Sequence, residues 1–343
     1  MTKIIVPLDG SELAEQALPL ASAITTKHHA EILLTTAISH GDRWIDNGVA
    51  GQVEAEEQAA VGRYLQSVID KLKERRVRAS MHVEWGRPHT VIGNAADRED
   101  ADVIVMTTHG RSGISRWTLG SVADKVLRTL STPLILIRPT TGAPPPNSVK
   151  RIAVPLDGST LAEAALPEAE RLARTMEGSL LLVRAVVPAA LVYGGEALPG
   201  ALPVLEDLEA EAKEYLERVA ERIRKRGVKA GVAVAVGVPA GVILELAGDN
   251  GANLVVMTTH GRSGLDRTAF GSVADAVVRR GELPVMMIRS WAGLAEGGRR
   301  DIPVAGNVVV PPPELTETEQ AAASPRVRRG GPRPHRPERS PGR

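Results

Sequence analysis

The feature that most constrains this chain is an internal repeat. The stretch VPLDGS occurs at 6–11 and again at 154–159, and MTTHGRSG occurs at 106–113 and again at 257–264. Both halves keep one order of landmarks, in which short aliphatic runs alternate with helix-length segments. The two copies lie about 150 residues apart, far more than the roughly 20–50 residues of a solenoid repeat. The sequence therefore predicts two copies of one domain.

The apolar pattern predicts the class of fold. The runs KIIVPL, EILLTTA, ADVIVMTT and PLILIR are short, aliphatic and rich in β-branched residues. Such runs are typical of strands buried on both faces, as in a parallel sheet. A segment between them carries apolar residues at helical spacing, namely Val61, Leu65, Val68, Ile69 and Leu72. Alternating strands and helices predict an α/β fold, doubly wound, with about five strands and four helices in each copy.

The repeat also predicts domain boundaries. We expect a first domain over 1–140, a Pro-rich linker over 141–149 and a second domain over 150–290. The remaining residues, 291–343, are rich in Pro, Gly, Ala and Arg and contain no third repeat. This composition predicts a disordered tail. Its basic end is interpreted as a solvated segment rather than as a specific nucleic-acid-binding arm.

Composition narrows the classes of function. Aromatic residues make up only 2% of the chain, so the cores must be aliphatic. The net charge of +1 gives no bias toward nucleic acid or an anionic membrane. The chain has no cysteine, which excludes disulfides, thiolate metal sites and a cysteine nucleophile. Without an apolar leader or a long apolar run, we expect a soluble cytoplasmic protein with no membrane partner.

Several catalytic and binding motifs are absent from the sequence. It contains no G-x-x-x-x-G-K-[ST] P-loop, no G-x-G-x-x-G after its first strand and no G-x-S-x-G elbow. Its eight histidines lack metal-ligand spacing. These absences argue against a P-loop NTPase, a dinucleotide site and a serine hydrolase.

The first apolar run of each copy ends in an Asp-Gly-Ser turn. These turns are Asp9-Gly10-Ser11 and Asp157-Gly158-Ser159. In a doubly wound sheet, ligands lie beyond the carboxyl ends of the strands. The serines are suitable N-caps for the following helices. Asp9 and Asp157 have two interpretations, either acceptors for a ligand's hydroxyl or amino group or parts of the turn.

The fourth apolar run of each copy ends in a longer loop. In the first copy the run ends at Thr108, and His109-Gly110 are separated by nine residues from Gly120-Ser121 at a helix start. His260-Gly261 and Gly271-Ser272 repeat this spacing. Unpaired amides and the positive dipole end of a helix suit an anion. The pattern predicts a phosphate site or, alternatively, an ordinary capped helix after a surface loop.

Charged and titratable side chains of the same loops are further candidates. Neither His109 nor His260 has a local carboxylate partner, so we interpret both as ordering the loop or contacting phosphate rather than as general bases. Additional charge-assisted contacts are predicted for the loop arginines, Arg111, Arg116, Arg262 and Arg267.

Together, VPLDGS, VIVMTTHGRSG and LGSVADKVL…TPLILIR resemble the universal stress protein family, and the chain resembles a tandem member of it. The resemblance spans about 1–138 and 150–289. It implies a five-stranded parallel sheet of order 3-2-1-4-5 in each domain. It also implies dimer-like pairing of domains through the last strands, within one chain or in a homodimer.

The resemblance further implies an ATP site, with or without Mg²⁺. ATP-binding members carry G-x-x-G, nine residues, and then G-[ST]. This chain keeps the spacing, but Thr107 and Thr258 replace the first glycine. Asp9 and Asp157 match an aspartate near adenosine, and Ala37 and Ala185 match a position whose backbone contacts adenine. The other matched positions are Gly110, Gly120, Ser121, Gly261, Gly271 and Ser272.

Three functions stay open at this point. One is a stress sensor or adaptor that binds ATP and protein partners of unknown identity. Another is a nucleotide-free scaffold in which Thr107 and Thr258 obstruct the site. The third is an ATP pyrophosphatase or adenylating enzyme, although the sequence has no Ser-Gly-Gly-x-Asp-Ser loop after its first strand. We therefore expect no enzyme, leaving slow ATP hydrolysis open.

Overall fold

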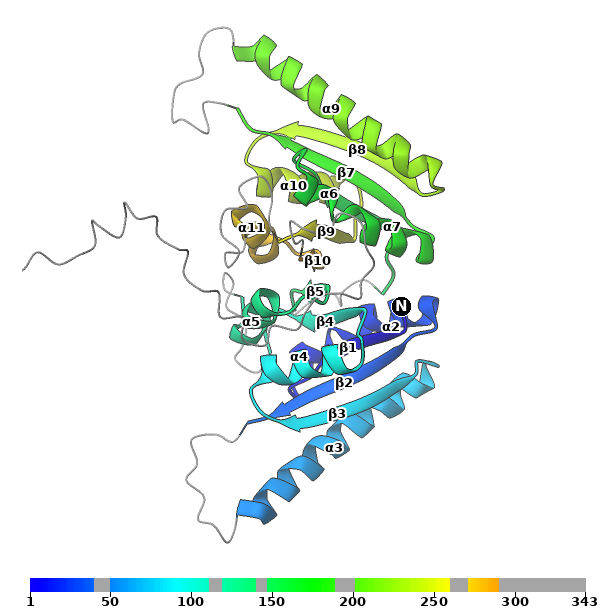
Figure 1. Cartoon of the computed structure of the whole chain (residues 1–343), viewed down its shortest axis with the longest axis vertical. Helices are drawn as coiled ribbons and strands as arrows, with labels where there is room; N and C mark the ends of the chain where they lie inside the picture. The colour runs from blue at the N-terminus through cyan, green and yellow to red at the C-terminus, as the bar shows by residue number, and fades with distance from the viewer. Residues whose placement is uncertain (40–49, 111–118, 140–146, 189–200, 260–270, 290–343) are drawn as a thin grey trace, which may run out of the picture. The chain divides into compact units, whose positions relative to one another are not determined.

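The structure is a computed structural model that describes residues 1–39, 50–110, 119–139, 147–188, 201–259 and 271–289. Strands and helices alternate along these residues in both halves of the chain (Figure 1). The predicted tail and most of the predicted linker lie outside the described residues. None of the described helices is both long and apolar enough to span a bilayer.

The first half forms a parallel sheet of strand order β3-β2-β1-β4-β5, which confirms the predicted topology. Short, mainly aliphatic runs form every strand except β3, which mixes polar and apolar residues, and β4 ends one residue earlier than expected. The amide of Thr108 nevertheless continues the ladder by donating to the carbonyl of Ile137 at 2.8 Å. The strands are β1 (Lys3–Pro7), β2 (Glu31–Ile38), β3 (Ala79–Trp85), β4 (Val103–Thr107) and β5 (Leu134–Ile137).

The second half repeats this sheet and joins it to the first. Strand β10 pairs antiparallel with β5, with Val285 opposite Leu136 and Met287 opposite Leu134. The two sheets thus form one ten-stranded sheet, and the two domains pair within one chain. The strands are β6 (Arg151–Pro155), β7 (Ser179–Val186), β8 (Lys229–Val236), β9 (Leu254–Thr258) and β10 (Val285–Ile288).

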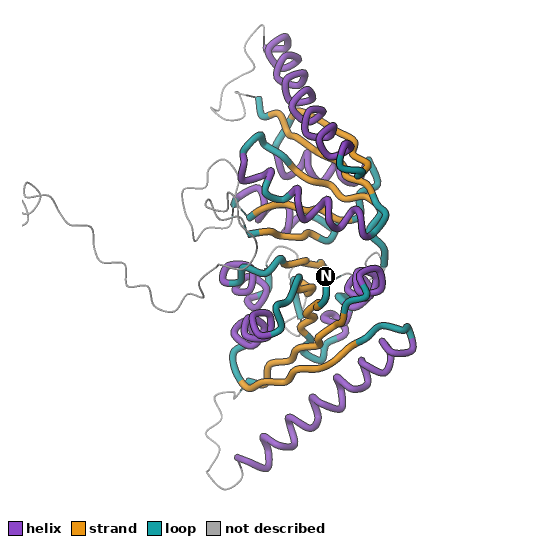
Figure 2. Tube along the Cα trace, turned by 45° about the vertical axis from the view of Figure 1, so that its right-hand side comes forward, coloured by secondary structure: helices purple, strands orange, loops and turns teal. Residues whose placement is uncertain are grey.

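Helices cover both faces of the sheet (Figure 2). The first predicted helix of each copy is split into two pieces, so the described part of each half holds five helices. Pro19 and Pro167 explain the split, because a proline has no N–H to continue the helical ladder and is tolerated only in a first turn. The helices are α1 (Glu12–Glu15), α2 (Leu18–His28), α3 (Ala50–Glu74), α4 (Pro88–Arg98), α5 (Ser121–Thr129), α6 (Thr160–Glu163), α7 (Leu166–Thr175), α9 (Ala201–Lys225), α10 (Pro239–Asp249) and α11 (Ser272–Arg280).

Side-chain alternation along the strands builds an aliphatic core on each face. Ile4 belongs to the core under α2 and α3, whereas Ile5 belongs to the core under α4 and α5. The stripe predicted for α3 is buried as expected, with Leu65 at 0% and Val68 at 1% exposure. Burial on both faces fixes the register of inner strands such as β1, β2, β4 and β5, since a one-residue slip would exchange the two cores.

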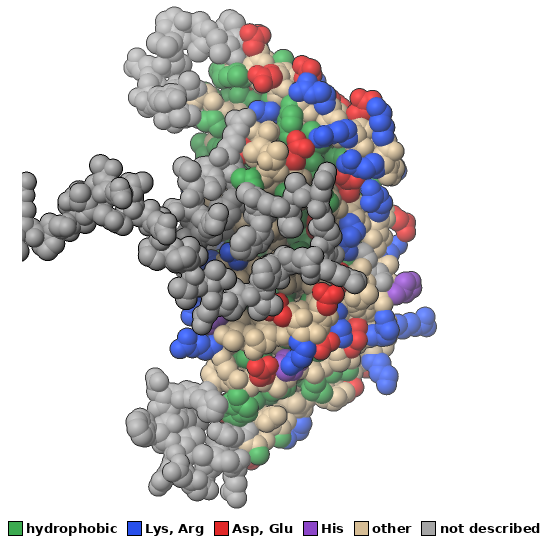
Figure 3. Space-filling view, viewed as in Figure 1, with side chains coloured by type: hydrophobic (Ala, Val, Ile, Leu, Met, Phe, Trp, Pro, Cys, Tyr) green, Lys and Arg blue, Asp and Glu red, His purple; other side chains and the backbone are tan. Residues whose placement is uncertain are grey.

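The outer surface of α9 is charged and carries both signs. Figure 3 shows Lys and Arg side chains interspersed with Asp and Glu side chains on this part of the surface. Three ion pairs lie along the helix, Arg218–Glu214, Arg224–Glu217 and Lys225–Glu221. Such exposed pairs contribute little to stability and indicate a solvated face.

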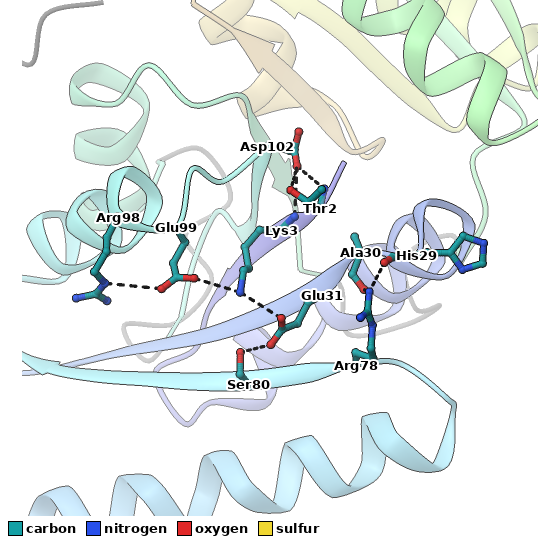
Figure 4. Close-up of polar contacts among 10 residues, drawn as sticks. All are labelled: Thr2, Lys3, His29, Ala30, Glu31, Arg78, Ser80, Arg98, Glu99 and Asp102. Atoms are coloured by element: carbon teal, nitrogen blue, oxygen red, sulfur yellow. Dashed lines mark hydrogen bonds and ion pairs between the residues drawn. The ribbon is translucent and has the colours of Figure 1, made fainter. Parts of the chain in front are cut away.

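A polar network holds the amino ends of the strands in the first domain (Figure 4). The ammonium group of Lys3 lies 3.2 Å from Glu31 and 3.1 Å from Glu99. Asp102 accepts hydrogen bonds from the amide of Thr2 at 2.6 Å and from the amide of Lys3 at 3.3 Å. This network ties β1, β2 and the start of β4 together at the edge opposite the predicted site.

Candidate functional site

Each domain has a cavity at the carboxyl edge of its sheet. The cavity of the first domain measures about 340 Å³ and that of the second about 460 Å³. Seven predicted site residues of the first copy line its cavity, namely Asp9, Ala37, Thr107, His109, Gly110, Gly120 and Ser121. The second cavity is lined by the corresponding residues Asp157, Ala185, Thr258, Gly271 and Ser272.

The other predicted positions lie outside the described residues. These positions are His260, Gly261, Arg111, Arg116, Arg262 and Arg267. Among the described residues, no three His, Asp or Glu side chains cluster in a way that would hold a metal ion.

Asp9 organises the turn after β1. Its Oδ1 accepts hydrogen bonds from the Ser11 amide at 3.0 Å and the Ser11 hydroxyl at 2.6 Å. Ser11 in turn caps α1, because its hydroxyl accepts from the amide of Ala14 at 3.2 Å. Asp157 and Ser159 repeat the arrangement at 2.9 and 2.6 Å. The aspartate therefore has a clear role in the turn, at the wall of the cavity.

The loop after β4 packs against this aspartate. A Cβ atom on Gly110 would collide with Oδ2 of Asp9, so the loop approaches the carboxylate through a residue without a side chain. This contact brings together two segments that lie about 100 residues apart in the sequence. The turn after β1 and the loop after β4 therefore meet at the wall of the cavity.

Thr107, at the position of the missing glycine, contacts its own loop. Its hydroxyl donates to the carbonyl of His109 at 2.7 Å, and the side chain is 5% exposed. The next residue, Thr108, places its hydroxyl 3.1 Å from Nδ1 of His109. The Thr-Thr pair therefore fixes the main chain and the ring of His109 where the loop leaves the sheet.

Helix α5 begins at the cavity without a side-chain cap. Its N-cap is Gly120, and the first helical hydrogen bond runs from the amide of Asp124 to the Gly120 carbonyl at 2.9 Å. The exposed Ser121 is the first helical residue. Helix α11 repeats this start with Gly271 and Ser272. Uncapped first-turn amides and the helix dipole suit a ligand's anionic group.

Gly120 is also required by the chain itself. Its amide donates to the carbonyl of Thr108 at 2.9 Å and closes the base of the loop. A Cβ at this position would lie 2.6 Å from that carbonyl oxygen, well inside van der Waals contact. Glycine at this position therefore does not by itself indicate a phosphate ligand.

The two cavities differ in their lining, because the second cavity extends farther toward its long helix, α9. In the second domain Arg184, Leu208 and Glu211 extend the lining toward α9. The guanidinium carbon of Arg184 lies 5.1 Å from the centre of the Tyr215 ring, a cation–π contact. The first domain has Thr36 in place of Arg184, and its hydroxyl donates to the Leu8 carbonyl at 2.8 Å.

The side chain of Tyr215 is held by a carboxylate. Its hydroxyl donates to Glu163 at 2.8 Å, and Arg222 pairs with the same carboxylate at 3.0 Å. Burial, with the neighbouring carboxylate of Glu163, raises the pKa of Tyr215, and Arg184 offsets part of the rise. This cluster was not predicted from the sequence. An alignment of the second strands of the two copies, EILLTTA and SLLLVRA, would have shown that Arg184 replaces Thr36.

The family follows from a comparison with known proteins. The model of the universal stress protein family matches residues 1–138 and 148–289. The chain belongs to this family. Two matches on one chain make it a tandem universal stress protein, as the internal repeat predicted.

Individual relatives match one domain or somewhat more. Universal stress protein Sll1388 of Synechocystis is 31% identical over 149 residues, which is 40% of this chain and 97% of that protein. Universal stress protein Rv2005c of Mycobacterium tuberculosis is 29% identical over 190 residues, 55% of this chain and 62% of its own length. A crystal structure of a universal stress protein from Archaeoglobus fulgidus covers 84% of this chain and 96% of its own, with a TM-score of 0.60 and 21% identity. That structural likeness shows the fold.

Proposed function

We propose that each domain of this universal stress protein binds an adenine nucleotide, ATP, in the cavity at the carboxyl edge of its sheet. The protein would act in the cytoplasm as a stress-responsive sensor or adaptor toward protein partners. One observation carries the proposal. Residues distant in the sequence, Asp9, Ala37 and Gly120-Ser121, line one cavity at an uncapped helix start, and the second domain repeats the arrangement.

The cavity has an end suited to each part of a nucleotide. The first amides of α5 favour the phosphates. The apolar side chains of Ile92 and Met106 line the same cavity and offer a surface for a flat base. Volumes of about 340 and 460 Å³ fit the range of roughly 300–1,000 Å³ for small-molecule sites. Mg²⁺ would bind with ATP as a counter-ion of its phosphates. The proposed role is binding of ATP, not its hydrolysis.

Charge substitution at Ser121 and Ser272 tests the proposal without disturbing the fold. Both serines are exposed at the first position of their helices. A glutamate there favours the helix dipole but repels phosphate. We expect isothermal titration calorimetry with ATP to show two sites in the wild type, one in Ser121→Glu and one in Ser272→Glu. The double variant should bind no ATP.

Glutamine substitutions are the matched control. Ser121→Gln and Ser272→Gln change size in the same way without adding charge, so they should keep most of the affinity. Thermal unfolding should show that the glutamate variants are no less stable than the glutamine variants. Equal ATP binding by wild type and double glutamate variant would contradict the proposal. A wild type that binds no ATP would favour the nucleotide-free scaffold.

A further inference from the structure

The floor of the first cavity contains a buried hydroxyl group. Thr35 of β2 lines the cavity and is 1% exposed. None of the described residues offers its Oγ1 a hydrogen bond. A buried polar group without a partner costs free energy, and native structures seldom keep one unless water or a ligand satisfies it.

The side chain of Thr35 lies on the face of β2 that the cavity occupies. Alternation along β2 places Thr35 on the same face as Leu33, which packs in the core with Ile92 of α4. Ile92 and Pro88 of α4 line the same cavity as Thr35. Rotation about the Cα–Cβ bond moves the hydroxyl group among staggered positions, so it can turn toward a polar ligand atom.

The strand order fixes which part of a ligand would lie over Thr35. Helix α5 follows β4, and β1 lies between β4 and β2. At a spacing of about 4.8 Å per strand, β2 is about 10 Å from β4. A nucleotide with its phosphates at Ser121 would therefore carry its base toward β2. Apolar walls at Pro88 and Ile92 suit the faces of a heterocycle.

The second domain has no hydroxyl at the equivalent place. Thr35 pairs with Pro7 of β1, and Val183 pairs with Pro155 of β6 in the same register. Val183 lines the second cavity and is fully buried. Thr35 and Val183 have nearly the same shape, so at this position the two cavities differ in hydrogen bonding alone.

We propose that Thr35 is a specificity-determining residue of the first domain. Its hydroxyl hydrogen-bonds an edge atom of the purine bound there, so the first domain discriminates between purine bases more strongly than the second. The inference rests on the proposed nucleotide function and goes beyond it by making the two sites unequal.

A reciprocal exchange tests the inference. Thr35→Val gives the first domain the residue of the second, and Val183→Thr does the reverse. Each is made in full-length protein with the other site closed, by Ser272→Glu and Ser121→Glu respectively. Isothermal titration calorimetry with ATP, GTP and inorganic triphosphate then measures the affinity of one site at a time. Strand β2 holds a threonine and strand β7 holds a valine at this equivalent position, so both variants should fold.

The expected results separate base recognition from phosphate binding. Thr35→Val should weaken ATP binding about three- to tenfold, the loss of one hydrogen bond, and narrow the ratio of ATP to GTP affinity. Binding of inorganic triphosphate should not change. Val183→Thr should widen the ATP to GTP ratio of the second domain.

Two other results would overturn the inference in different ways. An unchanged ATP to GTP ratio in Thr35→Val, with a higher melting temperature of the ligand-free protein, would show that the hydroxyl is only an unsatisfied core group. Absence of any nucleotide binding by the unsubstituted chain would reject the proposed function, and with it the role of Thr35.

Discussion

Arg289 donates a hydrogen bond from Nη1 to the main-chain carbonyl of Arg128 at 3.0 Å. Arg138 makes the reciprocal contact with the carbonyl of Arg279 at 3.2 Å. Each donor directly follows the last strand of its domain, and each acceptor lies in the last turn of the other domain's last helix. A cation at this end of a helix also interacts favourably with its dipole.

Removing both donors should loosen the pairing of the domains. We expect Arg138→Ala with Arg289→Ala to lower the free energy of unfolding by about 1 kcal/mol for each lost contact, since both groups are partly solvated. Amide hydrogen exchange should accelerate in β5 and β10 and stay unchanged in the outer strands β3 and β8. Arg218→Ala, on the solvated surface of α9, is the control. Unchanged protection of β5 and β10 would assign the pairing to the strands alone.

Two glycine substitutions should have opposite effects on stability. Gly120→Ala places a methyl group 2.6 Å from the Thr108 carbonyl and should cost about 1–3 kcal/mol as an overpacked contact. Gly62 lies within α3, and a Cβ there would meet no described atom within 4 Å. Gly62→Ala should therefore stabilise by about 0.5–1 kcal/mol through helix propensity. Urea unfolding of both variants checks the pair, and equal midpoints would refute the steric argument.

The carboxylate of Asp102 should make stability depend on acid pH. Burial raises its pKa, but hydrogen bonds from the Thr2 and Lys3 amides outweigh burial, so the pKa of Asp102 is lowered. A lowered folded-state pKa stabilises the protein above the unfolded value of about 3.9, and that contribution is lost as pH falls through the folded value.

Asp102→Asn should remove this part of the pH dependence. The second domain has Asn253 at the same place, where Oδ1 accepts from the amides of Lys150 and Arg151 at 3.1 and 3.2 Å. The amide can therefore keep both contacts without a titrating group. We expect urea midpoints between pH 7 and pH 2 to fall less steeply below about pH 4 than in the wild type. An identical profile would contradict the role of Asp102.

The reverse exchange in the second domain should be harmful. The side-chain amide of Asn253 donates to the carbonyl of Ser148 at 3.0 Å. In Asn253→Asp this donor becomes an oxygen that faces the carbonyl, and the lost contact should cost about 1–3 kcal/mol at neutral pH. Protonation would restore a donor, so the difference from the wild type should shrink in acid. Thermal unfolding of the variant and the wild type at pH 7 and pH 4 measures this difference in stability. A difference that stays the same at both pH values would contradict the explanation.

Most of the fold could be predicted because it follows from repeated local patterns. Short aliphatic runs define most strands, and parallel strands bring their carboxyl ends to one edge. The family resemblance assigned Asp9 and Gly120 to one predicted nucleotide site, and both line one cavity at that edge. The splitting of the first helix had a clear signal in Pro19 and Pro167, which the apolar pattern alone did not use. Local chemistry thus sets the elements and their order.

The remaining contacts depend on how side chains meet across the sheet. Thr107 donates to the loop carbonyl of His109, a choice that the spacing of glycines does not reveal. The reciprocal contacts of Arg138 and Arg289 require the register of β5 against β10, which no local pattern encodes. Thr35 could be recognised only once the structure showed its hydroxyl to be buried beside the cavity.

The continuous sheet has a consequence for how the two copies must stay together. Its outer edges are β3 and β8, so the uncharged strands β5 and β10 are covered on both sides. Either half alone would expose such a strand as an unpaired sheet edge and would be prone to associate with other chains. A covalent tether keeps the complementary edge at high effective concentration. The paired state should therefore persist at dilutions at which two separate halves would dissociate.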